Sequence, residues 1–323
     1  MSTINSLLRG SFILSRYIAS PQKKSLVCLS SAGISSTEPK HTLPTWVPDW
    51  EHTNDNRSVL GVGSRFSAAG STTPSLEISA DKMTLVIRGF AIDTISHVKG
   101  EFYEVELEKP DANPASLARQ EQDLLAVKQD LEKFDKFITK AFKPEINGAG
   151  LVARAWKYFT ELVAPGAVAM GQSGEDALCR TMCCDLSPFG ERALDKYRGA
   201  FKFWRMMFRA SNSKGKINWL WVNEKLWKDH HADGRELGHA VRSYSIGRNL
   251  CATERKYLGR VPHQSKVGDR ICIFKGGSVP FLVRKDVDDH YQLIGECYIH
   301  GIMDGEAMER DDLKSLEQDF KIR

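Results

Sequence analysis

Three polar side chains near the end of the chain have the types and spacing that could form a small chemical site. Glu296 and His300 lie four residues apart on one face of a predicted strand, and Asp304 follows shortly afterwards. An imidazole beside carboxylates can exchange protons near neutral pH. A single histidine without a pocket is rarely catalytic, so a hydrogen-bonded strand end is the favoured interpretation. We therefore assign no catalytic residue and keep these side chains as a candidate pocket.

The cysteines and histidines do not have the spacing of a metal site. Cys179 and Cys183 lie four residues apart, but the sequence has no C-x-x-C or H-x-x-x-H pair of the kind that binds zinc. It also has no Gly-x-Ser-x-Gly nucleophile elbow and no glycine loop that leads from a strand into a helix. We therefore expect no metal and no cofactor. The seven cysteines lie mostly beside apolar residues, which indicates buried, reduced thiols.

Composition narrows the class of protein further. With 323 residues, of which 41% are hydrophobic and 27% charged, the chain is typical of a soluble globular protein. Its net charge of +4 is small and both signs are interspersed, so we expect no nucleic-acid partner. Its apolar runs are far shorter than the roughly 20 residues of a spanning helix, which predicts no membrane span. We expect a cytoplasmic protein. The alternative is mitochondrial, because no acidic residue precedes Glu38 in a basic, serine-rich N-terminus.

Two regions that are far apart in the sequence have the apolar alternation of β-strands. Residues 76–98 predict a hairpin with a turn at Asp81-Lys82, followed by a third strand. The second region begins at about residue 249 and ends with a predicted strand over Tyr291–Met303. In that last strand Gly295 and Gly301 lie on one face, which indicates sharp bending as in a small closed barrel.

A hairpin is also predicted inside the second region. Its strands are Arg270–Phe274 and Val279–Val283, and Gly276 and Gly277 in the turn suit the positive φ angles of a tight hairpin. Pro280 has no N–H to donate to a neighbouring strand. The returning strand is therefore expected at an edge or at a bulge.

Between the two β regions the sequence predicts helices. Asn113-Pro114 combines a side-chain cap with a proline in the first turn, and it opens an amphipathic pattern of about 28 residues. Further helices are predicted at 151–163, 175–185, 188–210 and 219–228. The aromatic stripe of the 188–210 helix indicates a buried face rather than a cofactor site.

Together these elements predict an α+β fold. A small, bent antiparallel β-module with barrel-like form is built from the two distant β regions, and a large helical insertion separates them. The expected organisation is an N-terminal helix with a Ser/Pro-rich linker over 1–42 and the first part of the β-module over 43–110. The helical insertion then covers 111–243, the second part of the β-module 244–305 and a C-terminal tail 306–323.

Several blocks of sequence, taken in order, resemble a known family. The first is Leu43-Pro-Thr-Trp-Val-Pro-Asp-Trp50, which contains Trp46, Pro48 and Trp50, and the last runs from Gly295 to Ala307 and contains Gly301. Between them lie Phe66–Gly70, Leu85–Ile95, Leu178–Met182, Tyr257–Pro262, Gly268–Cys272 and Gly276–Arg284, the last with Gly276, Gly277, Pro280 and Arg284. In this order the blocks resemble the C-terminal region of fungal heterokaryon incompatibility (HET) proteins. The Tyr-x-Ala-Leu-Ser-Tyr-x-Trp-Gly type signature of the N-terminal HET domain does not occur in the chain.

The resemblance implies a non-enzymatic fungal protein of allorecognition, linked to heterokaryon incompatibility and programmed cell death after hyphal fusion. It implies action through contacts with protein partners, and it supplies no catalytic residue. A second hypothesis is an enzyme or ligand-binding accessory protein of a fungal biosynthetic pathway, which would use a pocket at Glu296, His300 and Asp304. A third is a truncated gene product without an independent role. The sequence does not give the partner, a ligand or the oligomeric state.

Overall fold

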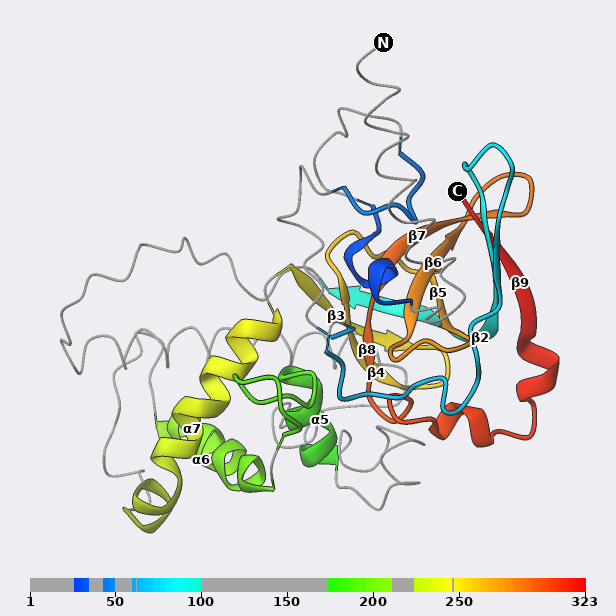
Figure 1. The fold of residues 1–323 in the computed structure, drawn as a ribbon. Helices are drawn as coiled ribbons and strands as arrows, with labels where there is room; N and C mark the ends of the chain where they lie inside the picture. The colour runs from blue at the N-terminus through cyan, green and yellow to red at the C-terminus, as the bar shows by residue number, and fades with distance from the viewer. Residues whose placement is uncertain are drawn as a thin grey trace, which may run out of the picture.

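The described part of the chain is built on one mixed β-sheet (Figure 1). The computed structural model describes residues 26–34, 43–49, 60–61, 63–99, 174–193, 195–210, 224–245 and 247–323, and the predicted helices at 113 and 151–163 lie outside them. In these residues the sheet has nine strands. They are β1 (Leu76–Ile78), β2 (Leu85–Lys99), β3 (Arg248–Thr253), β4 (Leu258–Pro262), β5 (Arg270–Phe274), β6 (Phe281–Lys285), β7 (His290–Glu296), β8 (Tyr298–Ile299) and β9 (Glu317–Ile322).

Five of these strands close into a ring. They follow the order β5-β6-β7-β9-β2, and β2 pairs in turn with β5. Strands of the two distant β regions therefore pair with each other, as expected. The expectation of a small antiparallel module is corrected, because β7 and β9 run parallel. A connection through the short helices η4 (Glu306–Glu309) and η5 (Leu313–Leu316) carries the chain back in the same direction, which a tight hairpin cannot do.

β2 is one strand of 15 residues, where a hairpin strand and a separate third strand were expected. It pairs with β9 over Leu85–Phe90, with β5 over Gly89–Thr94 and with β3 over Ile95–Lys99. At Gly89, where the pairing passes from β9 to β5, an added Cβ would lie 2.7 Å from the carbonyl oxygen of Ile273. Glycine is therefore needed where β2 joins the two sides of the ring.

β5 is buried on both faces, which explains its nearly continuous apolar sequence. Cys272 and Phe274 of β5 belong to a cluster that contains side chains from all five ring strands. Ile271 and Ile273 point to the opposite face and join a second cluster with β3, β4 and β8. Within the first cluster, the rings of Phe274 and Phe320 have centroids 5.5 Å apart. Aromatic packing thus links β5 to β9 across the ring.

Three helices lie together on one side of the sheet (Figure 1): α5 (Gly174–Met182), α6 (Lys196–Ala210) and α7 (Glu224–Ser245). α6 and α7 pack closely, since an added Cβ at Gly199 would lie 2.2 Å from Cε1 of His230. α6 begins later than the predicted helix over 188–210, because residues 185–193 form a loop. α7 continues to Ser245, well past the predicted end at 228. No described helix is long and apolar enough to cross a membrane.

Candidate functional site

Glu296, the first residue of the candidate pocket, is a buried carboxylate at the end of β7. Its two oxygens accept hydrogen bonds from the backbone N–H groups of Leu60, at 3.0 Å, and Gly61, at 2.8 Å. The guanidinium of Arg248 lies 2.7 Å from the same carboxylate and also donates to the Glu296 carbonyl oxygen at 3.1 Å. Glu296 therefore ties residues 60–61 to strands β3 and β7.

His300 is a buried imidazole that follows β8. Its Nδ1 is hydrogen-bonded to the Tyr298 hydroxyl at 2.8 Å, and its backbone N–H donates to the carbonyl oxygen of Leu258 at 2.9 Å. Burial and, to a smaller extent, the positive charge of Arg180 lower the pKa of His300 to about 4. The imidazole is therefore neutral at neutral pH.

Asp304 lies at the surface, where its carboxylate pairs with Arg192 at 2.8 Å. Each residue of the candidate pocket thus has its own partners: Glu296 engages Arg248, His300 engages Tyr298, and Asp304 engages Arg192. His300 and Asp304 both lie near the same group of charges. Arg192 pairs with Asp304, and its positive charge also lowers the pKa of His300. That group of charges comes from the helical part of the chain.

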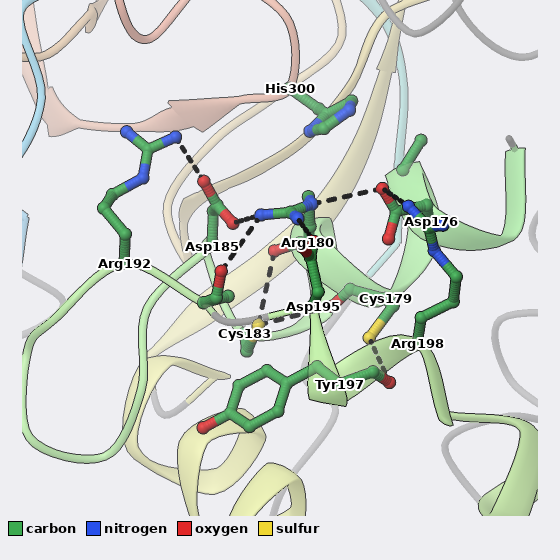
Figure 2. Close-up of polar contacts among 12 residues, drawn as sticks. Asp176, Cys179, Arg180, Cys183, Asp185, Arg192, Asp195, Tyr197, Arg198 and His300 are labelled. Carbon is green, nitrogen blue, oxygen red and sulfur yellow. Dashed lines mark hydrogen bonds and ion pairs between the residues drawn. The ribbon is translucent and has the colours of Figure 1, made fainter. Parts of the chain in front are cut away.

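We call this group the Asp185 cluster: Asp176, Arg180, Asp185, Arg192 and Arg198. Figure 2 shows Asp185 between two guanidinium groups, those of Arg180 and Arg192. Arg180 is 2.5 Å from Asp185 and 3.3 Å from Asp176, which also pairs with Arg198 at 3.5 Å. Burial raises the pKa of the Asp185 carboxyl, although both arginines act in the opposite direction. The cluster joins α5, the following loop and α6 to the turn after β8 through Arg192 and Asp304.

This cluster was not predicted from the sequence. One signal was available, because Asp176 and Arg180 lie four residues apart on a predicted helix, the spacing of a helical ion pair. No periodic signal exists for Asp185 and Arg192. They meet because the chain turns back between them through an isolated β-bridge of Leu186 with Arg192.

The thiols beside the cluster are buried and protonated. Burial raises the pKa of Cys184 to about 11 and raises those of Cys179 and Cys183 well above the ordinary value. The Cys183 thiol donates to the Cys179 carbonyl oxygen at 3.4 Å. In the part of the chain that the structure describes, no group of three or more His, Cys, Asp or Glu side chains could hold a metal ion.

The residues of the first family-like block, which we call motif residues together with those of the later blocks, lie in packed positions. Trp46 is fully buried and its indole N–H donates to the Met83 carbonyl oxygen at 3.4 Å. Pro48 beside it is buried, whereas Trp50 lies outside the described residues. The Thr45 hydroxyl accepts a hydrogen bond from the backbone N–H of Leu293 in β7 at 2.8 Å. This segment is therefore fixed to the ring.

The motif glycines Gly276, Gly295 and Gly301 have φ angles of 75°, 146° and 88°. These values lie in the region that favours glycine. At Gly276 an added Cβ would also lie 2.3 Å from Pro74, and at Gly295 it would lie 3.0 Å from Pro262. These glycines permit turns and close packing at the ends of β5, β7 and β8.

The other motif residues connect neighbouring segments. The Gly277 carbonyl oxygen accepts from Ala69 N–H at 3.0 Å, and the Pro280 carbonyl oxygen accepts from Cys297 N–H at 2.9 Å. Arg284 donates two hydrogen bonds to the buried Asp269 carboxylate, at 2.8 and 2.9 Å. The motif thus describes how the β segments are joined.

Comparisons with known proteins bear directly on this arrangement. Residues 190–318 match the family model of the Het-6 beta-barrel domain. The chain is also 25% identical over 300 residues to heterokaryon incompatibility protein 6, OR allele, of Neurospora crassa. The chain is therefore similar to a heterokaryon incompatibility protein over most of its length. The resemblance found in the sequence is thereby confirmed.

The match covers most of this chain but less than half of the Neurospora protein. The alignment with the Neurospora protein includes 87% of this chain but 41% of that protein, so the chain spans about two fifths of its relative. The family model covers α6, α7 and strands β3 to β8, while β1 and β2 lie before it. No solved structure matches the chain significantly.

Proposed function

We propose that this chain takes part in fungal non-self recognition, as the name of its Neurospora relative indicates for that protein. The observation that carries the proposal is the similarity to heterokaryon incompatibility protein 6 across most of this chain, together with the Het-6 beta-barrel match. We also propose that the five-strand ring is the barrel of that domain, completed by β2 and β9. The chain would act in the cytoplasm, where the contents of fused hyphae mix.

The proposed mode of action is contact with another protein rather than catalysis. The charged groups that could do chemistry serve the fold: Glu296 binds two backbone N–H groups and Arg248, and Asp185 binds two arginines. The imidazole of His300 is neutral and buried. Charged groups that are already paired within the fold hold its segments together. Their pairing supports a role as a rigid recognition surface.

A hyphal fusion assay tests the proposal. The chain is expressed in Neurospora crassa, and the strain is fused with a panel of tester strains, with an empty-vector strain as the control. Expression alone should leave growth unchanged, whereas fusion with some testers should reduce growth and kill fused cells. Growth equal to the empty-vector control in every pairing would refute a role in recognition.

A further inference from the structure

Phe189 is the most exposed large apolar side chain in the described part of the chain. It is 84% exposed, compared with 69% for Val287 and 65% for Val267. It lies at the tip of the segment Asp185–Ala193, which we call the Phe189 loop. Leaving a phenylalanine in water forgoes its burial energy, so its position calls for an explanation.

The Phe189 loop is ordered by its own hydrogen bonds. The Ser187 N–H donates to the Glu191 carbonyl oxygen at 2.7 Å, and Ala193 N–H donates to the Asp185 carbonyl oxygen at 2.8 Å. At the tip, the Ser187 hydroxyl accepts from the N–H groups of Phe189 and Glu191, both at 3.3 Å. These bonds hold the backbone on both sides of Phe189.

The base of the loop is anchored to the rest of the molecule. The Tyr244 hydroxyl of α7 donates to the Ser187 carbonyl oxygen at 3.0 Å, and Arg192 lies over the ring of Phe66, 4.8 Å from its centroid. Cys184 and Asp185 have φ angles of 50° and 53°, a conformation that non-glycine residues adopt at a cost. The buried Asp185 carboxylate fixes this turn by binding Arg180 and Arg192 (Figure 2). An anchored loop loses little conformational freedom on binding.

The surroundings of Phe189 are acidic although the chain as a whole is basic. Two exposed carboxylates follow Phe189 in the sequence, those of Glu191 and Asp195, and the second lies 3.6 Å from Arg180. The Asp185 carboxylate is buried between Arg180 and Arg192 and does not contribute to this surface. Glu191 is exposed two residues from Phe189, and the Asp195 side chain is 94% exposed. The charge of Arg192 is balanced by Asp185 and Asp304. A complementary surface would carry positive charge around an apolar centre.

We propose that the Phe189 loop docks on another protein, with Phe189 inserted into an apolar pocket whose rim carries lysine or arginine. The inference rests on the proposed function and names the part of the chain that makes the contact. A rigid aromatic side chain at the centre of an interface, surrounded by charges that orient the partner, is the arrangement of a binding hot spot. Docking would bury the one large apolar side chain that the fold leaves almost wholly in water among the described residues.

A photo-crosslinking experiment locates the contact. The full chain is expressed in Neurospora crassa with benzoylphenylalanine at position 189 or, as a matched control, at position 287, where Val287 is also exposed. Crosslinks at 189 should join peptides of another protein that combine apolar residues with lysine or arginine, and position 287 should give at least tenfold less of this product. Crosslinking at 189 no higher than at 287, or only to a second copy of the chain, would overturn the proposal.

Two substitutions in the loop and one control substitution separate this inference from the proposed function. Phe189→Ser should abolish growth reduction in the fusion assay, and it should weaken binding to the crosslinked protein at least about tenfold. Glu191→Lys should weaken binding less at high salt than at low salt, whereas Val287→Ser should behave as the wild type. If the wild-type chain reduces growth and Phe189→Ser does so equally, the loop is not the contact and the proposed function stands. If the wild-type chain has no effect in any pairing, the proposed function fails.

Discussion

Asp185 illustrates how a single buried charge can organise a loop. Its carboxylate separates the guanidinium groups of Arg180 and Arg192, and it lies in a turn with positive φ. Burial alone disfavours the charged form, which the raised pKa of Asp185 reflects. The carboxylate is retained because removing it would leave two guanidinium groups side by side. Its contribution is therefore best measured by removing the charge and keeping the shape.

Replacing Asp185 by Asn should lower the free energy of unfolding by about 3 kcal/mol, the usual effect of removing one partner of a buried ion pair. Asparagine tolerates the left-handed backbone, so the substitution tests the charge alone. Urea denaturation gives the measurement. The control is Asp195→Asn, whose 94% exposed side chain should change the free energy by less than about 0.5 kcal/mol. Equal losses in the two variants would show that the buried pairing does not stabilise the fold.

His300 makes stability depend on pH. Its pKa is about 4 in the folded chain and about 6.5 in the unfolded chain. The unfolded state therefore binds more protons between these values, and the stabilisation present above pH 6.5 is lost as pH falls toward 4. From pH 7.5 to 5 the wild type should lose about 2 kcal/mol more than His300→Gln. The variant His263→Gln, at an exposed turn, serves as the control and should keep the wild-type loss.

The partners of the candidate pocket residues could not be predicted from the sequence, because they lie far away along the chain. Arg192 and Asp304 are 112 residues apart, and Leu60 and Glu296 are 236 apart. Periodicity reports neighbours within one helix or strand, such as Asp176 and Arg180. The residue types near the end of β7 were recognised as notable, but the contacts that hold them follow from ring closure.

At the scale of elements, the turn between β5 and β6 shows how a glycine motif supports the ring. Gly276 has a positive φ angle, and its α-carbon lies against Pro74, just before β1. The turn therefore serves both its own hairpin and the chain entering β1. The positive φ angle and the close contact with Pro74 both require glycine at position 276, and substitutions can distinguish these two requirements.

Gly276→Ala should lower the free energy of unfolding by about 3 kcal/mol, since it combines backbone strain with a steric clash. Gly268→Ala is the matched control, because Gly268 also has a positive φ angle, 92°, but an added Cβ there meets nothing within 4 Å. It should lose about 1 kcal/mol, the cost of the backbone alone. Thermal and urea unfolding of both variants measure the difference. A similar loss in both would mean that contact with Pro74 is not important.

Element types were predicted better than element ends. Alternation identified residues 76–98 as β-structure, but it could not show that β2 runs unbroken past Gly89, because a glycine in a strand equally indicates an end. The helix predicted over 188–210 was placed too early, since Ser187-Pro188 has the form of a helix start but lies within the Phe189 loop. A serine followed by a proline occurs both in turns and at helix starts, so the sequence could not distinguish the two here.

At the scale of the whole molecule, the matched family region is not a complete structural unit. Residues 190–318 contain β3 to β8, whereas the ring also needs β2 and β9. Four of the six residues of β9 lie after this region, in a segment that was predicted to be a tail. Its place in the sheet could not be foreseen, because six residues of mixed polarity carry little signal until their partners are known.

A fragment of residues 190–318 should therefore not fold by itself, as judged by circular dichroism and amide exchange. Without β2 and β9, two ring strands, β5 and β7, would each have an unpaired edge, and the aromatic cluster would be exposed. Co-expression of residues 174–323 with residues 26–99 should restore a soluble, folded complex, because the two pieces carry all nine described strands. A cooperative unfolding transition in the short fragment alone would contradict the need for β2 and β9.

The pairing of β2 with β9 has a consequence for how the chain is made. β2 ends at Lys99 and β9 ends at Ile322, so 322 − 99 = 223 residues must leave the ribosome after β2 before the ring can close. At roughly 5–20 residues per second, β2 waits about 10–45 s with an open edge. Such high contact order slows folding and prolongs exposure to aggregation. Nascent-chain chaperones are thus expected to act on β2 until β9 has left the ribosome.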